Sequence, residues 1–205
     1  MSARQVDAVI LDLGNVLVFH DNALLIRRIA ARAGGGEEAE QRLAEALSGP
    51  LSEAINRGAL DAEGIRREVS RVGGGDIPMP EFFELWSSHF TPNEAVFPRV
   101  EALAREVPLV LLSNTNVLHW EYERPRLPIL DRFRAFVLSH EVGVAKPDAA
   151  IYQRAAEAAG VPPARAAFFD DVPIYVESAR ALGFRAYVFL DAMEFDRQLR
   201  ALGLA

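Results

Sequence analysis

One short stretch near the start of the chain, DAVILDLGNVLVF over residues 7–19, constrains the fold more than any other. Its apolar residues 9–11 are typical of a strand buried on both faces, as in the interior of a parallel sheet. Asp12 follows where this strand ends, and Gly14 then allows a sharp turn and a close approach to a ligand. Ligands of open α/β sheets bind beyond the carboxyl ends of the strands. The stretch therefore predicts either a functional carboxylate at Asp12 or a simple polar turn.

The second half of the chain alternates between helical and strand patterns. We expect helices at 96–105, 149–159, 174–182 and 194–202, and strands at 109–112, 135–138, 166–169 and 186–189. This alternation predicts a doubly wound α/β fold, with a parallel sheet covered by helices on both faces. The strand before Asp12 must join that sheet, because a lone strand cannot bury both of its faces.

Helical patterns alone fill the segment between these two parts. They run over 22–32, 37–47, 51–57, 61–72 and 80–89, with glycine triplets ending two of them. We therefore predict a core domain formed by residues 1–18 and 96–205, and a small helical cap formed by residues 19–95. An insertion directly after Asp12 would cover the carboxyl edge of the sheet as a lid. The alternative is a second domain unrelated to the site.

Composition excludes several classes of function. The 205 residues include no cysteine, which excludes disulfides, thiolate chemistry and cysteine-bound zinc. A net charge of −7 argues against a nucleic-acid surface but leaves small anionic substrates possible. No apolar run is long enough to span a membrane, and the first residues do not resemble a signal peptide. We expect a cytoplasmic protein without membrane or nucleic-acid partners.

Polar groups follow several of the predicted strands at the same edge of the sheet. Lys146 is the single lysine among 22 basic residues, and it precedes a proline in a loop between a strand and a helix. Phosphoryl transfer through a carboxylate needs one Asp to attack phosphorus, a second to hold Mg²⁺, and a hydroxyl and a lysine to neutralise the phosphoryl oxygens. The groups in question are Asp12, Ser113 with Asn114, Lys146, and Asp170 with Asp171.

The segments DLGNV, LLSNTN, Lys146-Pro147 and FFDDVPIYVESARALG together resemble the motifs of the haloacid dehalogenase (HAD) superfamily, over nearly the whole chain. They are most similar to its subfamily I phosphatases, which include bacterial α-D-glucose-1-phosphate phosphatase and the phosphatase domain of soluble epoxide hydrolases. The resemblance also matches the predicted cap. It implies a Mg²⁺-dependent phosphatase acting on a small phosphomonoester, such as a sugar phosphate.

The resemblance further implies a role for each motif residue. Asp12 would be the nucleophile that forms an aspartyl-phosphate, while Ser113 and Lys146 hold the phosphate. Mg²⁺ would be bound by Asp12, Asp171 and the backbone carbonyl of Gly14. Asp170 would orient Lys146, and the remaining motif positions, Asn114 and Asn15 together with Gly14, are predicted to bind substrate.

Two positions depart from the pattern of the family's phosphatases. Gly14 stands where most of them carry an Asp that acts as general acid and base, and Tyr175 stands where they carry an Asp or Asn near the metal. Both departures are compatible with weak turnover. His20 and Asp21, at the entry to the cap, are the candidates to replace the missing acid, although Asp21 also suits the cap of the helix that follows.

The sequence leaves two rival functions open. One is a 2-haloacid dehalogenase, which the acidic pair Asp170 and Asp171 disfavours, and the other is a catalytically weakened phosphate-binding protein. His119 and Trp120 are interpreted either as substrate contacts or, more simply, as packing, and no role is assigned to His89 or His140. The physiological substrate and the oligomeric state are not predicted.

Overall fold

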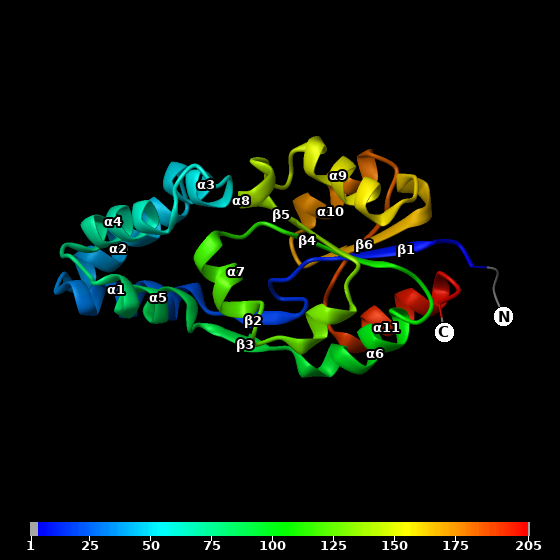
Figure 1. The fold of residues 1–205 in the computed structure, drawn as a ribbon, viewed down its shortest axis with the longest axis horizontal. Coiled ribbons are helices and arrows are strands. Elements are labelled where there is room, and N and C mark those ends of the chain that lie inside the picture. The colour runs from blue at the N-terminus through cyan, green and yellow to red at the C-terminus, as the bar shows by residue number, and fades with distance from the viewer. Residues whose placement is uncertain (1–3, 205) are drawn as a thin grey trace.

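The computed structural model describes residues 4–204. Its centre is a five-stranded sheet in the order β5-β4-β1-β6-β7, in which all neighbouring strands are parallel (Figure 1). The predicted doubly wound α/β architecture is confirmed. The strands are β1 (Ala8–Leu11), β4 (Leu109–Ser113), β5 (Ala135–Leu138), β6 (Ala166–Asp170) and β7 (Arg185–Val188).

Two layers of helices cover the sheet, because alternate residues of each strand point to opposite faces. Val9 and Leu11 pack with the helices on one face, and Ala8 and Ile10 pack with those on the other. All four side chains are fully buried, which explains why β1 is apolar throughout. The first face carries α6 (Phe97–Leu103), η2 (Pro128–Arg132) and α11 (Ala192–Ala201), and the second carries α9 (Ala149–Ala159) and α10 (Pro173–Ala181) (Figure 1).

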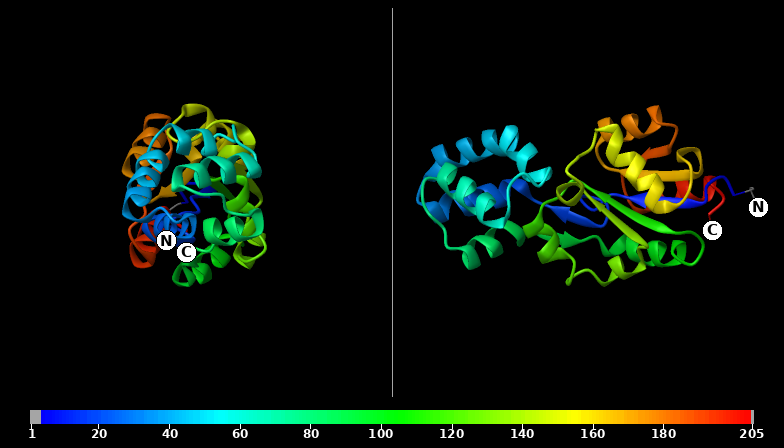
Figure 2. Two further views of the ribbon diagram at one scale, coloured as in Figure 1. Left: turned by 90° about the vertical axis from the view of Figure 1, so that its left-hand side faces the viewer. Right: turned by 45° about the horizontal axis from the view of Figure 1, so that its top comes forward.

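A separate group of helices lies beyond the carboxyl end of the sheet, and we refer to it as the cap (Figures 1 and 2). Phe82, Trp86 and Ile65 are among the buried residues of its own apolar cluster, which is distinct from the two clusters on the sheet. Its helices are α1 (Asn22–Ala33), α2 (Gly36–Leu47), α3 (Pro50–Asn56), α4 (Ala62–Gly73) and α5 (Met79–Ser87).

A short antiparallel ribbon, formed by β2 (Val18–His20) and β3 (Phe90–Pro92), carries the chain into and out of the cap. The sequence did not predict it. Strands of three residues are too short to show a period, and their pairing joins segments about 70 residues apart that no local pattern connects. In this ribbon His20 is paired with Phe90, which places the imidazole at the boundary between the sheet and the cap.

The cap also rests on two further helices of the core, α7 (Val117–Glu123) and α8 (Ser139–Val142). Leu118 of α7 is buried within the cap's apolar cluster, and its carbonyl accepts a 3.4 Å hydrogen bond from Ser87 Oγ. At α8 the contact is tighter: Gly58 has φ = +69°, and a Cβ there would lie 2.1 Å from the carbonyl oxygen of His140. Only glycine tolerates both conditions, so Gly58 permits the close approach of the cap to the core.

The remaining elements are η1 (Glu94–Val96) and η3 (Pro163–Arg165). The predicted strand positions agree with the observed ones to within a residue: β4 and β6 each extend by one residue, into Ser113 and Asp170, and β7 lies one residue earlier than expected. Within residues 4–204, every helix is too short or too polar to cross a membrane.

Candidate active site

Three neighbouring strands deliver the polar side chains of the site to one edge of the sheet. Asp12 follows β1, Ser113 is the last residue of β4, and Asp170 is the last residue of β6. Because β1 lies between β4 and β6, these side chains are brought together, and all three are buried. The predicted convergence of Asp12, Ser113 and Asp170 is therefore what the sheet order produces.

Lys146 is held between two carboxylates beneath this edge. Its Nζ lies 2.9 Å from Asp12 Oδ1, donates to Asp170 Oδ2, and donates a 3.3 Å hydrogen bond to the carbonyl of Leu112. The side chain is 1% exposed. Burial alone lowers the pKa of Lys146, but the attraction of Asp12 and Asp170 outweighs it and holds the pKa above its ordinary value. The ammonium is thus a permanent positive charge beside Asp12.

The carboxyl of Asp12 is strongly perturbed by the same surroundings. Burial is the largest cause that raises its pKa and the nearby charge of Asp170 adds to it, while the ammonium of Lys146 opposes them; together they raise the pKa from 3.8 to about 7. A divalent cation would offset the cost of burying this charge and favour the carboxylate, which is the nucleophilic form.

Asn114 and Tyr175 fix the position of Lys146. The Asn114 side chain accepts from Lys146 N at 2.8 Å and donates to Lys146 O at 2.9 Å, next to the cis peptide bond between Lys146 and Pro147. The Tyr175 ring lies 5.1 Å from Lys146 Nζ, and its hydroxyl accepts from Asn114 Nδ2 at 3.4 Å. Tyr175 thus shields the lysine instead of supplying the metal-side acceptor found in the family pattern, and the substrate-binding role of Asn114 stays a prediction.

Asp12, Asp170 and Asp171 each offer a carboxylate oxygen within 4.8 Å of the others. Asp170 is already engaged on both sides, because its Oδ2 accepts from Lys146 and its Oδ1 accepts from Val172 N at 2.8 Å. Asp12 and Asp171 each have one oxygen paired, with Lys146 and Asn15 respectively, and each offers the other as a hard oxygen donor of the type that Mg²⁺ prefers. The residues present therefore fit the predicted metal, with Asp170 serving the lysine.

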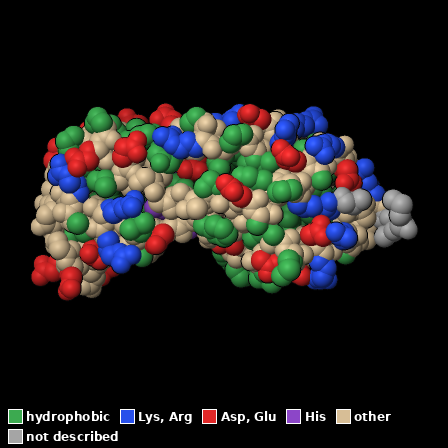
Figure 3. Space-filling model, turned by 90° about the horizontal axis from the view of Figure 1, so that it is seen from below, with side chains coloured by type: hydrophobic (Ala, Val, Ile, Leu, Met, Phe, Trp, Pro, Cys, Tyr) green, Lys and Arg blue, Asp and Glu red, His purple; other side chains and the backbone are tan. Residues whose placement is uncertain are grey.

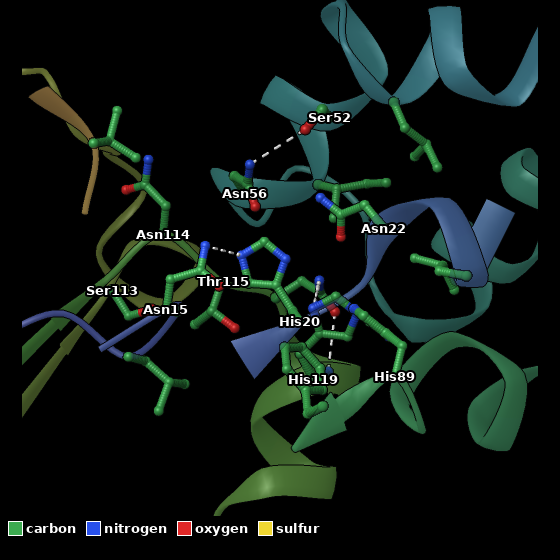
Figure 4. Close-up of a pocket in the computed structure, with 18 of the residues that line it drawn as sticks. Asn15, His20, Asn22, Ser52, Asn56, His89, Ser113, Asn114, Thr115 and His119 are labelled. Carbon is green, nitrogen blue, oxygen red and sulfur yellow. Dashed lines mark hydrogen bonds between the residues drawn. The ribbon is translucent and has the colours of Figure 1, made fainter. Parts of the chain in front are cut away.

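Asn15 connects Asp171 to the ribbon. Its backbone is left-handed, with φ = 52°, and its Nδ2 donates to Asp171 Oδ2 at 2.8 Å. The same Nδ2 lies 3.3 Å from His20 Nε2, a contact drawn as a dashed line in Figure 4. Asn15 is therefore engaged by two side chains of the site, and its predicted contact with substrate is untested.

A cavity of about 410 Å³ extends from Asp12 into the cap. Seen from below, the molecule is indented between the cap and the core (Figure 3). Away from the sheet edge, the cavity wall combines apolar side chains, among them Leu25, Ile55 and Trp86, with neutral polar ones. The neutral polar side chains contributed by the cap are Asn22, Ser48, Ser52 and Asn56. Figure 4 labels Asn22, Ser52 and Asn56.

The structure bears differently on the two interpretations of His119 and Trp120. His119 Nε2 donates to the carbonyl of Trp86 at 3.1 Å, and its Nδ1 accepts from Asn116 Nδ2 at 3.0 Å. Burial lowers the pKa of His119 well below its ordinary value, so the ring is neutral. Trp120 packs on Phe136, with ring centroids 5.1 Å apart. Trp120 therefore serves packing, whereas His119 both packs against Trp86 and lines the cavity, so its contact with substrate stays a prediction.

Sequence reasoning missed several residues that line the cavity, including His89 and Phe90. His89 is 5% exposed, and burial lowers its pKa to about 4. A histidine without a ligand-like partner nearby in sequence gave no signal, because its neighbours in space come from the ribbon and from α7. Asp21 does not line the cavity: it caps α1, accepting from Leu24 N at 2.8 Å.

The chain is similar to several known proteins, some along most of its length and one along less than half of it. It is 24% identical to D-ribitol-5-phosphate phosphatase of Bacteroides thetaiotaomicron over 95% of this chain and 97% of that one. A phosphatase of Mycobacterium tuberculosis is 38% identical over 43% of this chain and 41% of its own length. Among solved structures, a HAD family enzyme of B. thetaiotaomicron in complex with magnesium and inorganic phosphate has a TM-score of 0.82 at 24% identity, covering 95% of this chain and all of that chain.

Haloacid dehalogenases share the fold at lower similarity. The L-2-haloacid dehalogenase of Xanthobacter autotrophicus has a TM-score of 0.65 at 20% identity, covering 98% of this chain and 84% of that chain. The sequence pattern of the haloacid dehalogenase-like hydrolases matches residues 6–183. With the parallel sheet and the acidic edge described above, this match shows that the chain is a hydrolase that belongs to the haloacid dehalogenase-like family.

Proposed function

We propose that this hydrolase is a Mg²⁺-dependent phosphatase that removes phosphate from a small phosphomonoester through an aspartyl-phosphate at Asp12. The observation that carries the proposal is the buried Lys146, bonded to both Asp12 and Asp170, with Asp171 beside them at the mouth of a cavity. A permanent cation next to a buried carboxylate suits the attack of one anion on another. We expect the protein to act in the cytoplasm, without nucleic-acid or membrane partners.

Each polar group at the sheet edge has a part in this reaction. An Asp12 carboxylate oxygen attacks phosphorus, while the Ser113 hydroxyl and the Lys146 ammonium bind the phosphoryl oxygens. Asp170 holds Lys146 in place. Mg²⁺, held by Asp12, Asp171 and the carbonyl of Gly14, would supply positive charge that brings the phosphoryl group and the carboxylate together. In the second step, water releases phosphate and restores Asp12.

The proposed division into a core (1–18 and 96–205) and a cap (19–95) bears on the substrate. The cavity of about 410 Å³ suits a small molecule, and its cap side offers neutral hydrogen-bonding groups from Asn22, Ser52 and Asn56. Hydroxyl groups of a sugar or alditol phosphate match such a lining. The similarity to a D-ribitol-5-phosphate phosphatase supports the same class of substrate.

A dehalogenase needs neither a metal-binding pair of acidic residues nor a lysine held between two carboxylates. The presence of Asp170 and Asp171 therefore favours the phosphatase. The test is hydrolysis of 4-nitrophenyl phosphate and a panel of sugar and alditol phosphates, with Mg²⁺ or with EDTA, beside a parallel assay of 2-chloropropionate. We expect phosphate release that requires Mg²⁺ and no chloride release. Metal-independent chloride release would support the dehalogenase. Phosphate binding with no release from any ester would support the weakened binding protein.

A further inference from the structure

Hydrolysis of an alkyl phosphate requires a proton for the departing oxygen, because an alkoxide is a poor leaving group. The charged side chains at the sheet edge are poorly placed to give one. Lys146 is bound by two carboxylates that hold its pKa high. Asp12 is the nucleophile, and Asp171 faces the proposed metal. For such a substrate, a further titratable group is needed next to Asp12, on the side from which the substrate enters.

His20 is placed at this position by the ribbon. A Cβ built on Gly14 would lie 3.3 Å from His20 Nε2 and 3.9 Å from Asp12 Oδ2, so the imidazole and the nucleophile border the same small space above Gly14. The backbone of Gly14 is outside the left-handed region that disfavours side chains. The backbone conformation therefore does not require glycine at this position. The lack of a side chain instead leaves room for the His20 ring.

The ring is also oriented. His20 Nε2 is 3.3 Å from Asn15 Nδ2, which in turn donates to Asp171, while His20 Nδ1 is buried and has no hydrogen-bond partner among residues 4–204. An amide nitrogen can only donate, so Nε2 carries a lone pair in this arrangement. In this structure Nε2 is therefore unprotonated, and it lies on the side of the ring that faces the site. Figure 4 shows the imidazole of His20 turned toward Asn15.

The other titratable groups near the cavity are less suited. Asp21 is occupied as the cap of α1. Both nitrogens of His119 are engaged by Trp86 and Asn116. The His89 ring centroid is 6.5 Å from that of His20, and the three atoms nearest to a Cβ on Gly14 belong to His20 and Asp12. Tyr175 covers Lys146.

We propose that His20 is the general acid and base of this enzyme and occupies the space that the absent side chain of Gly14 leaves open. This inference rests on the proposed phosphatase function. In the first step His20 is in its imidazolium form, with Nε2–H turned away from the Asn15 amide. A bond forms between Asp12 and phosphorus as the ester P–O bond breaks, and the departing oxygen takes the proton from Nε2, which leaves the imidazole neutral. In the second step neutral Nε2 takes a proton from the attacking water, and the bond between phosphorus and Asp12 breaks to release the carboxylate.

The first experiment measures kcat/KM for phosphomonoesters of increasing leaving-group pKa, from 4-nitrophenyl to alkyl, in the Mg²⁺-loaded parent and in His20→Gln. Glutamine can still accept from Asn15 but cannot transfer a proton. We expect alkyl esters to lose about a hundred- to ten-thousandfold, the range for a general acid, and 4-nitrophenyl phosphate to change by less than about tenfold. Asp21→Asn keeps a capping side chain on α1 and is the matched control. Its kcat/KM should depend on the leaving-group pKa as steeply as that of the parent.

A second readout addresses the base step. With 4-nitrophenyl phosphate, slower reaction of water with the aspartyl-phosphate should produce a burst of nitrophenol equal to the enzyme concentration in His20→Gln. A third uses a double variant, Gly14→Asp with His20→Ala, which moves a proton-transferring group into the same space. We expect it to recover alkyl ester hydrolysis relative to His20→Ala alone.

The outcomes separate the two proposals. Equal losses on aryl and alkyl esters, or no loss, would overturn the role of His20 while leaving the phosphatase standing. A parent that hydrolyses no ester with Mg²⁺ would overturn the phosphatase and the role of His20 together. Circular dichroism and thermal unfolding of each variant exclude misfolding as the source of a loss.

Discussion

The two sides of the cavity are built differently. At the sheet edge, Asp12, Lys146 and Asp170 form one buried chain of ion pairs, and Asn114 is bonded to the lysine backbone. On the cap side the polar groups are neutral and make few bonds, as in the 3.4 Å contact between Asn56 Nδ2 and Ser52 Oγ. Buried charges must be matched in fixed positions, whereas neutral groups at a cavity wall can be exchanged at little cost. The sheet edge is therefore suited to catalysing the reaction, and the cap side of the cavity is suited to selecting the substrate.

The largest effect should come from the centre of the edge. Asp12→Asn keeps the shape of the side chain but removes the proposed nucleophile, so we expect phosphatase activity to fall by more than about a thousandfold. Circular dichroism should show an unchanged fold. Activity retained with full Mg²⁺ dependence would refute the assignment of Asp12.

Lys146→Arg tests how strictly the edge is fixed. A planar, longer guanidinium cannot replace a compact ammonium between Asp12 and Asp170, so we expect turnover to fall about ten- to a thousandfold. The matched control is Arg32→Lys in the cap, whose pair with Glu81 is exposed and should be indifferent to the exchange. An arginine variant as active as the parent would mean that the edge is as permissive as the cap.

The third prediction concerns His89, at the junction between the cap and the sheet edge: its burial should make the free energy of unfolding depend on pH. Burial, with a smaller effect of His20, lowers the pKa of His89 from 6.5 to about 4. Between pH 6.5 and pH 4 this histidine binds more protons in the unfolded chain than in the folded protein. The contribution of the neutral ring to the free energy of unfolding is therefore fully present above pH 6.5 and is lost as the pH falls toward 4. We expect a contribution on the order of 1–3 kcal/mol.

Urea titrations of the parent and of His89→Phe, made between pH 7 and pH 4, measure this contribution. Phenylalanine keeps a ring against Phe90, whose centroid is 4.2 Å away, and has nothing to titrate. The free energy of unfolding of the variant should fall less steeply with acid. Parallel curves for the two proteins would show that His89 is not held neutral by the fold.

The smallest effect should come from the cap wall. Asn56→Ala removes one neutral hydrogen-bonding group from the cavity, so we expect KM for a sugar or alditol phosphate to rise about three- to tenfold while kcat is kept. Gln41→Ala, on the exposed face of α2, is the control and should change neither constant. A drop in kcat as large as that of Lys146→Arg would erase the distinction between chemistry and selection.

Most of the fold followed from local patterns. The buried strands and their order of appearance predicted the parallel sheet, since a run such as 166–169 has no stable place except inside one. The polar residues at the strand ends were found in the same way. The ribbon of β2 and β3 was missed, because three-residue strands carry no period, and so was α8, which is a single turn.

The sequence by itself determined which chemical groups stand at the end of each strand, because a strand that is buried on both faces must be apolar until it leaves the sheet. Only the tertiary structure decided how those groups are shared: Asp170 with Lys146, Asn114 with the backbone of Lys146, and Asn15 with both Asp171 and His20. It also assigned Asp21 to a helix cap and set His20 above Gly14. The physical reason is that burial is a property of single residues in a local pattern, whereas partnership depends on contacts between distant segments.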